Sequence, residues 1–464
     1  VLASPRLGLN WAVRNGTDLR GGVGIFTGHD PFSWLAFAYS NTGTGARLLN
    51  CAGAAAPNFV PNPNAQPTSC VTGSSASAAS VSYFVPNFKM PQSVKTSLGV
   101  DQRLPWGVVA SLDLSYVRGL NSLYITDDNL TGPVGTLRGE GGRAMYGTVA
   151  GASAKGALPA VTPSVVTPAF GPVLRNANHS GDRTYLGTVQ VQKQFANGME
   201  FDAAYTSMNA KDYFSLRDAQ SVSNYGFAPV DGSLASRNLA VSSYSVPNQV
   251  TLSGTVNGPY GLAFSTIYLG RSGSPYTYVV NGDANADGVG NKVGAFDRQA
   301  DDPVYVPTGP ADISLVRDSA IGGGANLLVK ASPAAYDSLE KFIESDACLR
   351  QHRGILLPRN ACRNPWQNIV NARVAKRVSL PSGHSVEVSL DIFNVLHLLN
   401  ADWGLVRETG TLSGAGTENV PLLRLRGQDT IDGRNLYDLT LPARNVINVD
   451  ASRWRLQLGA RWAL

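Results

Sequence analysis

The chain has 464 residues, of which 43% are hydrophobic and only 15% are charged, and its mean hydropathy is −0.07. A soluble chain normally carries about 25% charged residues, so this deficit argues against an ordinary soluble enzyme. The net charge of +5 comes without a basic run or basic helix, which excludes nucleic acid as a partner. No stretch approaches about 18 consecutive apolar residues, which excludes helical membrane spans.

The chain opens with a hairpin in which apolar side chains alternate with polar or small ones. Residues 6–13 place Leu7, Leu9 and Trp11 on one face, and a turn at 15–18 leads into the second strand, 19–28. This period of two predicts strands with one apolar face. The same unit recurs at 93–101 with 107–117, 184–193 with 199–208, 249–257 with 261–270, and 368–379 with 385–395, and a last strand is predicted at 454–464.

The connections between these strands alternate between short and long. The long ones cover residues 29–91, 119–182, 209–246, 271–366 and 396–450. Compact soluble domains rarely carry several loops of this length, whereas outer-membrane barrels combine short periplasmic turns with long extracellular loops. The sequence therefore predicts an all-β fold, an antiparallel transmembrane β-barrel in the cell outer membrane, with lipid against its apolar face.

The predicted strands number about eleven, and an odd count does not close a bacterial barrel. Either the long loops hide further strands, or residues 1–464 are the C-terminal half of a larger barrel of about 22 strands, the size of plugged transporters. We favour the second interpretation. Charged side chains expected on the inner face, where they would contact a plug or line a lumen, are Arg6, Arg20, Asp113, Glu200, Asp202, Glu387, Asp391, Arg455 and Arg461. Aromatic residues expected in the membrane-interface girdles are Trp11, Trp106, Tyr116, Trp454 and Trp462.

The four cysteines form two local pairs, Cys51 with Cys70 and Cys348 with Cys362. Short-range pairs in apparent loops favour disulfides in an oxidising compartment. Zinc and free thiols are the alternatives, but neither pair has CxxC spacing or a matching set of histidines.

One loop carries oxygen ligands at alternate positions, Asp283, Asn285 and Asp287, followed by Gly288. Calcium takes six to eight oxygens, and Asn291, Asp297, Asp301 or Asp302 are candidates to complete the shell. The loop departs from an EF-hand because its twelfth position is Gly294 and no flanking helices are evident. Calcium is thus the candidate cofactor, and a solvated turn rich in Asp and Asn is the alternative.

Ordered motifs along the chain resemble TonB-dependent outer-membrane receptors of the Oar-like type. They are Ser4-Pro5-Arg6 with Leu9-Asn10-Trp11, residues 20–28, Arg271-Ser272-Gly273 with Pro275-Tyr276, residues 281–288, Arg359-Asn360 with residues 362–366, and residues 391–396 with 400–404. The resemblance implies a barrel closed by an N-terminal plug, transport driven through the TonB system, and insertion by the barrel-assembly machinery. Neither a plug nor a TonB box is visible in residues 1–464.

Two functions follow as hypotheses. The first is a TonB-dependent transporter or receptor that takes a bulky substrate across the outer membrane. The second is a passive or structural outer-membrane protein, an adhesin or a secretion pore, that binds partners through its long loops. An enzyme is not expected, because the sequence offers no nucleophile elbow and no nucleophile–base set.

Overall fold

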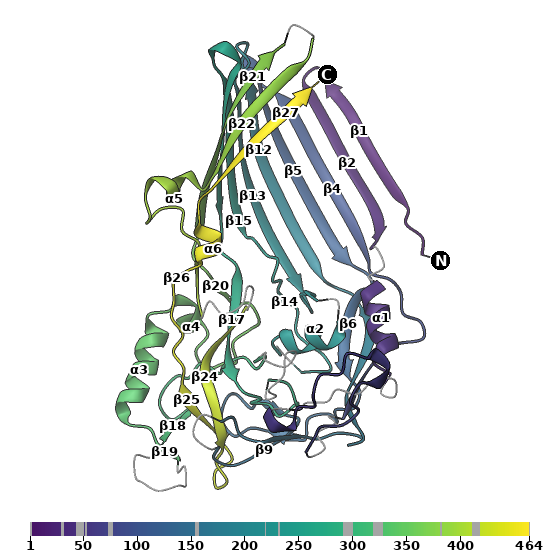
Figure 1. Ribbon diagram of the computed structural model, residues 1–464, viewed down its shortest axis with the longest axis vertical. Coiled ribbons are helices and arrows are strands. Elements are labelled where there is room, and N and C mark those ends of the chain that lie inside the picture. The colour runs from purple at the N-terminus through teal and green to yellow at the C-terminus, as the bar shows by residue number, and fades with distance from the viewer. Residues whose placement is uncertain are drawn as a thin grey trace.

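The computed structural model describes residues 2–28, 32–42, 51, 53–72, 78–153, 157–218, 220–230, 233–290, 300–318, 328–380, 383–410 and 418–463. Its main feature is one antiparallel sheet, which we call the wall (Figure 1). Eleven long strands follow each other across it: β1 (Arg6–Arg14), β2 (Thr17–Thr27), β4 (Gln92–Arg103), β5 (Val108–Gly119), β12 (Arg183–Gln194), β13 (Glu200–Asp212), β15 (Asn248–Asn257), β16 (Leu262–Arg271), β21 (Gln367–Ser379), β22 (Ser385–Phe393) and β27 (Arg455–Ala463). A short strand, β14 (Ala240–Val241), adds to the edge of β13.

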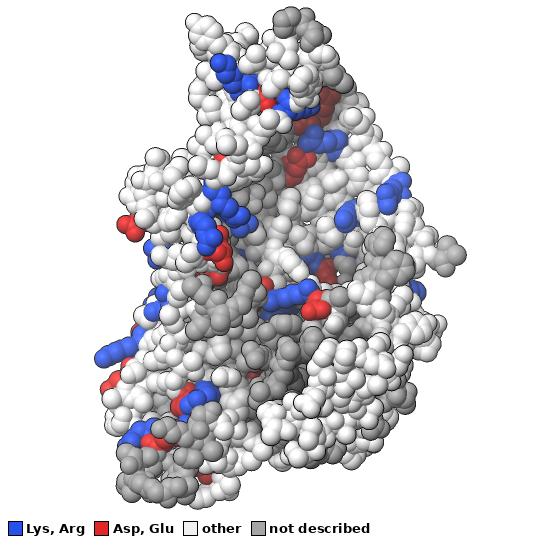
Figure 2. Space-filling model, viewed as in Figure 1, with Lys and Arg blue, Asp and Glu red and all other residues white. Residues whose placement is uncertain are grey.

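Side chains of the wall sort by face, as the alternation predicts. Leu7, Leu9 and Trp11 are 73%, 58% and 55% exposed, and such exposure of large apolar groups would be unfavourable in water. The opposite face lines a hollow, where Figure 2 shows acidic and basic side chains gathered beside each other. An apolar outside and a polar inside suit a wall that separates lipid from water. None of the helices described has both the length and the apolar character to span a bilayer.

Short turns join the strands at one end of the wall. In two of them a Pro-aromatic-Gly segment forms a 3-10 turn, η3 (Pro105–Gly107) and η4 (Pro259–Gly261). Trp106 and Tyr260 take left-handed backbone conformations there, with φ of 63° and 60°, and both side chains are 87% exposed. The predicted girdle residue Trp106 therefore projects from the tip of a turn.

The long connections, residues 28–91, 120–182, 213–247, 272–366 and 394–454, gather at the other end of the wall, and we call them the loop body (Figure 1). They contain a six-stranded and a three-stranded sheet. The first orders β19 (Leu328–Lys330), β18 (Ser314–Asp318), β25 (Asn435–Leu439), β24 (Asn419–Gln428), β17 (Pro275–Asn281) and β20 (Cys362–Arg363); the second orders β3 (Ala79–Phe84), β11 (Phe170–His179) and β6 (Ser122–Asp127).

Smaller elements complete the loop body. Its helices are α1 (Phe32–Ser40), α2 (Ser221–Phe227), α3 (Pro333–Glu344), α4 (Ala347–Gln351), α5 (Val395–Leu399) and α6 (Val449–Ser452), with 3-10 turns η1 (Gly53–Ala55) and η2 (Pro63–Ala65). Its two-stranded ladders pair β7 (Gly135–Thr136) with β8 (Ala144–Met145), β9 (Gly147–Val149) with β10 (Val161–Pro163), and β23 (Arg407–Glu408) with β26 (Val446–Ile447).

The hydrophobic core lies in the loop body and not in the wall. Two clusters of buried apolar residues, one around Tyr278, Leu425 and Ile343 and one around Ile125 and Leu174, are built wholly from the long connections. The sequence analysis treats these stretches as loops, and the structure differs because they fold into packed sheets and helices. In β17 and β24 most residues are buried, and several other strands have only two to five residues, so these strands lack the alternation that identifies the wall strands.

Candidate functional site

The first part of the site is a network of ion pairs on the inner face of the wall. Arg20 on β2 contacts both Asp101 on β4 and Asp113 on β5, the latter with 2.8 Å between Nη2 and Oδ2. Gly99 lies between Arg20 and Asp113, and a Cβ there would come within 2.6 Å of side-chain atoms of both. The absence of a side chain at position 99 therefore lets an arginine reach across one strand to the next.

A second network lies on β21 and β22. Arg377 approaches Glu387 at 2.9 Å, and Arg373 lies 3.4 Å from both Glu387 and Asp391. Predicted inner-face residues Arg20, Asp113, Glu387 and Asp391 thus join two networks. The other predicted inner-face residues have separate neighbours. Arg6 stacks over Phe26 at 4.3 Å, Glu200 accepts a hydrogen bond from Gln194 at 3.2 Å, and Asp202 accepts one from Gln190. In the pairing of β22 with β27, Arg461 lies opposite Glu387 and Arg455 lies opposite Phe393.

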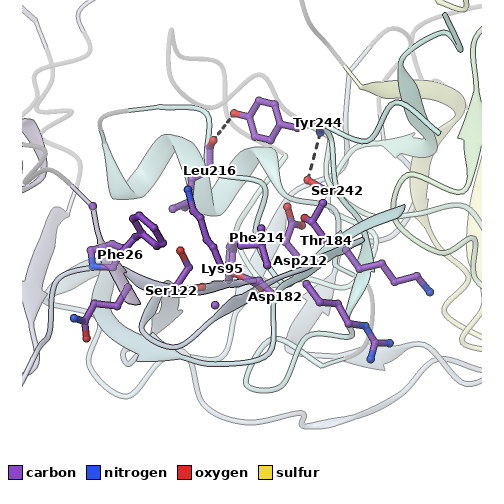
Figure 3. A pocket seen from close by; sticks show the side chains of 18 of the residues that line it. Phe26, Lys95, Ser122, Asp182, Thr184, Asp212, Phe214, Leu216, Ser242 and Tyr244 are labelled. Carbon is purple, nitrogen blue, oxygen red and sulfur yellow. Dashed lines mark hydrogen bonds between the residues drawn. The ribbon is translucent and has the colours of Figure 1, made fainter. Parts of the chain in front are cut away.

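A cavity of about 450 Å³ lies where the inner face meets the loop body (Figure 3). Five wall strands and three long connections contribute to it. Its lining mixes charged, aromatic and hydroxyl side chains. The cationic residues are Lys95, Arg183 and Lys211, and the acidic ones are Asp182 and Asp212. The aromatic residues are Phe26, Phe214 and Tyr244, and the hydroxyl groups include those of Ser93, Ser122, Thr184 and Ser242. Such a mixture suits a polar ligand with both charged and flat apolar parts.

Two acidic residues anchor the cavity to the loop body. Asp182 accepts a hydrogen bond from the Tyr213 backbone N–H at 3.1 Å, and burial raises the pKa of its carboxyl group. Asp212 pairs with Arg359 at 2.8 Å, and the Arg359 side chain is only 3% exposed. A buried arginine therefore ties the cavity lining to the segment that leads into β20.

The sequence did not indicate this cavity. Its lining comes from positions between 26 and 244, and most of the residues stand at the ends of strands whose alternation shows only which face they share. Lys95, Asp182 and Lys211 carry no motif. In connection 213–247, Phe214 lines the cavity, whereas Tyr225 is buried in the smaller core cluster.

The acidic loop proposed for calcium is buried in the loop body. Asp283, Asn285 and Asp287 are at most 5% exposed, and the adjacent Asp301 and Asp302 are each 1% exposed. This contradicts the alternative of a solvated turn. Burial raises the pKa of Asp287 to about 7 and raises the pKa values of Asp283, Asp301 and Asp302. The candidate ligands Asn291 and Asp297 lie outside the described residues.

The loop is fixed by its own side chains and by an arginine that sequence reasoning missed. Oδ1 and Oδ2 of Asp283 accept from the backbone N–H groups of Asp287 and Gly288, at 3.0 and 2.8 Å. Asp302 Oδ2 accepts from Ala284, and its Oδ1 lies 3.3 Å from the buried Arg143. Arg143 also pairs with buried Glu140 at 2.9 Å.

The cysteines are joined as the two local pairs that the sequence predicts. Cys51 bonds Cys70, and Cys348 bonds Cys362, with S–S distances of 2.02 and 2.03 Å. The second disulfide connects α4 to β20 beside the larger core cluster. Both lie in the loop body, the part of the chain expected outside the cell.

Comparison with known proteins identifies the family to which this fold belongs. Residues 2–402 match a family profile described as an outer membrane beta-barrel domain, and no curated protein matches the chain in sequence. Similar solved structures include the outer membrane transporter YddB from Escherichia coli (10% identity, TM-score 0.44) and a mutant of the ferric enterobactin receptor PfeA from Pseudomonas aeruginosa (10% identity, TM-score 0.40). Each alignment covers 99% of this chain and 40% of the other.

The chain thus spans about two fifths of the length of the solved structures it resembles. The family match covers most of the 464 residues, and it agrees with the wall of antiparallel strands, its apolar outer face and its polar hollow. The family consists of membrane barrels and not of enzymes. The chain belongs to the outer membrane beta-barrel domain family, and its place in the cell is the outer membrane.

Proposed function

We propose that residues 1–464 form the C-terminal half of a TonB-dependent transporter of the Oar-like type, within a barrel of about 22 strands. The observation that carries this proposal is the open wall. Eleven strands pair in sequence order, and in the described residues β1 and β27 each pair on one side only. Unpaired strand edges are unfavourable in lipid, because no water satisfies their N–H and C=O groups. A matching set of strands on the two edges would close the barrel.

The inner face supports transport of a bulky substrate. Paired arginines and carboxylates line the hollow, where a plug would pack, and the cavity lies between this face and the loop body. A substrate caught by the loop body would meet the cavity before it reaches the plug. Partners under this proposal are lipid on the apolar face, the barrel-assembly machinery during insertion, and the TonB system through a plug on the remaining part of the protein.

The second candidate is a passive adhesin or secretion pore. It is favoured by the packed core of the loop body, since a rigid surface of this size suits partner binding without transport. The two candidates differ in one property: a plugged barrel blocks ions until energy is supplied, whereas a passive pore conducts without it.

The test uses the complete protein encoded by the gene, purified from outer membranes and placed in planar bilayers. We expect a heat-modifiable band on gels, little spontaneous conductance, and retention of the complete protein by an immobilised TonB C-terminal domain. Steady conductance without TonB binding would establish the passive pore instead. Lack of both conductance and TonB binding would favour the adhesin.

The cavity is tested in the same material. Lys95→Ala with Lys211→Ala removes two of its cationic side chains, and Lys376→Ala serves as a control because this wall lysine is not part of the lining. We expect TonB-dependent uptake by cells to fall only in the cavity variant, while both variants keep normal heat modifiability. Equal uptake in the two variants would remove the cavity from the transport route.

A further inference from the structure

Four of the five long connections meet at the acidic loop. Asn285 O accepts from the Tyr146 backbone N–H at 2.8 Å, and Ala284 O accepts from Asn435 Nδ2 at 2.9 Å. Asp301 O accepts from the Val230 N–H at 2.9 Å. These contacts bring together connections 120–182, 213–247, 272–366 and 394–454. Whatever stabilises the acidic loop therefore stabilises the junction of most of the loop body.

The charges at this junction do not balance. Five buried carboxyl groups gather there, Asp283, Asp287, Asp301, Asp302 and Glu140, with two buried guanidinium groups, Arg143 and Arg237. Arg143 pairs with Glu140 and Asp302. Arg237 interacts electrostatically with Asp287 and Asp301, but it forms no ion pair among the described residues. Buried charges in proteins are paired, neutralised by protons or bound to metal ions, so protons or a bound cation must balance this buried excess.

Asp301 provides a separate observation that points to a ligand. Its side chain is 1% exposed, and its Oδ2 atom has no hydrogen-bond partner among the described residues. The adjacent Asp302 accepts hydrogen bonds from the backbone N–H groups of Ala284 and Asn285 at 2.6 and 3.2 Å, which places Asp301 beside the acidic loop. A buried carboxylate oxygen without a partner is unfavourable unless something occupies the position that it faces.

We propose that Asp283, Asn285, Asp287 and Asp301 bind one Ca²⁺ ion at the junction of the loop body. Calcium suits the site better than magnesium. Mg²⁺ retains several of its waters, whereas these oxygens lie in a dry interior, at most 5% exposed. Ca²⁺ accepts six to eight oxygens in flexible geometry, and main-chain carbonyl groups can supply the remainder.

Binding requires a local rearrangement. In the described part of the chain, no three acidic, histidine or cysteine side chains already surround one point. The Asp283–Gly288 hydrogen bonds fix the loop backbone, so Asp301 is the group that turns toward it, and the amide oxygen of Asn285 joins from within the loop. The ion then neutralises two of the three carboxylate charges that Arg143 leaves unpaired.

The test titrates Ca²⁺ alone into the complete protein in detergent after chelator treatment, by isothermal titration calorimetry. We expect one saturable site, with Mg²⁺ binding much more weakly. Asp287→Asn and Asp301→Asn keep side-chain shape while each removes one charged ligand, and each should weaken Ca²⁺ binding at least about tenfold. Asp450→Asn is the matched control, because the Asp450 side chain is 90% exposed and its ion pair among the described residues is with Arg453. This variant should leave binding unchanged.

Three results would overturn the proposal: no binding to the wild-type protein, equal weakening by Asp450→Asn, or undiminished binding by Asp301→Asn. If Asp287→Asn or Asp301→Asn fails to fold, terbium luminescence of the wild-type protein tests the site instead. Tyr146 and Tyr225 interact electrostatically with Asp287 and would sensitise a bound lanthanide ion. Luminescence that Ca²⁺ displaces supports the site, and its absence rejects it.

Discussion

Gly99 shows how one missing side chain organises the inner face. The space above its Cα is filled by the Arg20 and Asp113 side chains, which meet across β4. Gly99→Ala should push these two groups apart. Because both are partly exposed, the expected loss of unfolding free energy is only about 0.5–1 kcal/mol, measured by equilibrium unfolding of the complete protein in lipid vesicles.

Gly8→Ala is the control for this prediction. Gly8 lies on the same inner face, and a Cβ there would meet only one atom, at 3.9 Å. We expect the unfolding free energy of the Gly8→Ala variant to equal that of the wild-type protein. The Gly99→Ala effect should shrink in high salt, which screens the lost ion pair; an effect that is independent of salt would contradict this explanation.

Asp182 makes the cavity sensitive to pH. Burial raises the pKa of this carboxyl group in the folded protein, so the folded state holds the proton more tightly than the unfolded state. Its contribution to stability is therefore largest at low pH and is lost as pH rises from the ordinary aspartate value through the raised pKa. Asp182→Asn removes this dependence.

The measurement is the melting temperature of both proteins between pH 4 and pH 8. The variant should gain relative to the wild type as pH rises, because the wild type bears the cost of a buried charge. Asp218→Asn, in the loop body outside the cavity lining, should follow the wild-type curve. A constant difference across the pH range would mean that Asp182 is not the titrating group.

At the scale of elements, the wall was predictable and the loop body was not. The strand predicted at 93–101 is β4 (Gln92–Arg103), and the long connection predicted at 271–366 matches residues 272–366. Wall strands separate lipid from water, so residues along each strand alternate between apolar and polar, and this alternation is visible in the sequence. β17 (Pro275–Asn281) is buried on both faces for almost its whole length, so alternation vanishes there and the sequence resembles an irregular loop.

The candidate sites divide in the same way. The disulfides and the acidic loop are local in sequence: the cysteine spacing predicted both bonds correctly, and metal binding by the acidic loop stays a prediction. The cavity is assembled from strand ends far apart in the chain, and Arg143 reaches Asp302 from a different long connection, so neither carries a local sequence signal. Sequence analysis can find a site whose residues are close together in the sequence. It misses a site whose residues come together only in the folded structure.

The two disulfides should differ in importance. Cys348–Cys362 closes a separation of 14 residues beside the larger core cluster, whereas Cys51–Cys70 closes 19 residues around the exposed Phe59. Cys348→Ser with Cys362→Ser should cost about 3 kcal/mol of loop-body stability, from the loop entropy returned to the unfolded state. Limited proteolysis should then cut within α3 and α4.

Cys51→Ser with Cys70→Ser is the comparison. We expect it to admit protease only near residues 53–72, with the sheets of the larger cluster still protected. General digestion of the loop body in this second variant would show that the peripheral disulfide also supports the core.

The whole molecule is folded against two different surroundings. Leu114, 47% exposed at the middle of β5, faces the lipid side, and the adjacent Ser115 faces the hollow. Leu114→Arg should destabilise the protein in bilayers by about 2–4 kcal/mol, because it places a cation in the hydrocarbon region. Ser115→Arg should change stability far less. Folding of the complete protein into vesicles measures both, and equal effects would contradict the assignment of faces.

Each connection of the loop body leaves the wall on one strand and returns on the strand beside it. Its two ends are therefore held about 5 Å apart by the sheet, whatever folds between them. The wall holds the two ends of each connection close together. Any foreign domain whose own N- and C-termini lie close together can therefore take the place of a connection. In connection 28–91, Trp34, Phe84 and Phe88 pack against the smaller core cluster and β3 pairs with β11, whereas residues 53–72 add nothing to either cluster. A guest domain inserted within residues 53–72 would therefore leave both clusters in place.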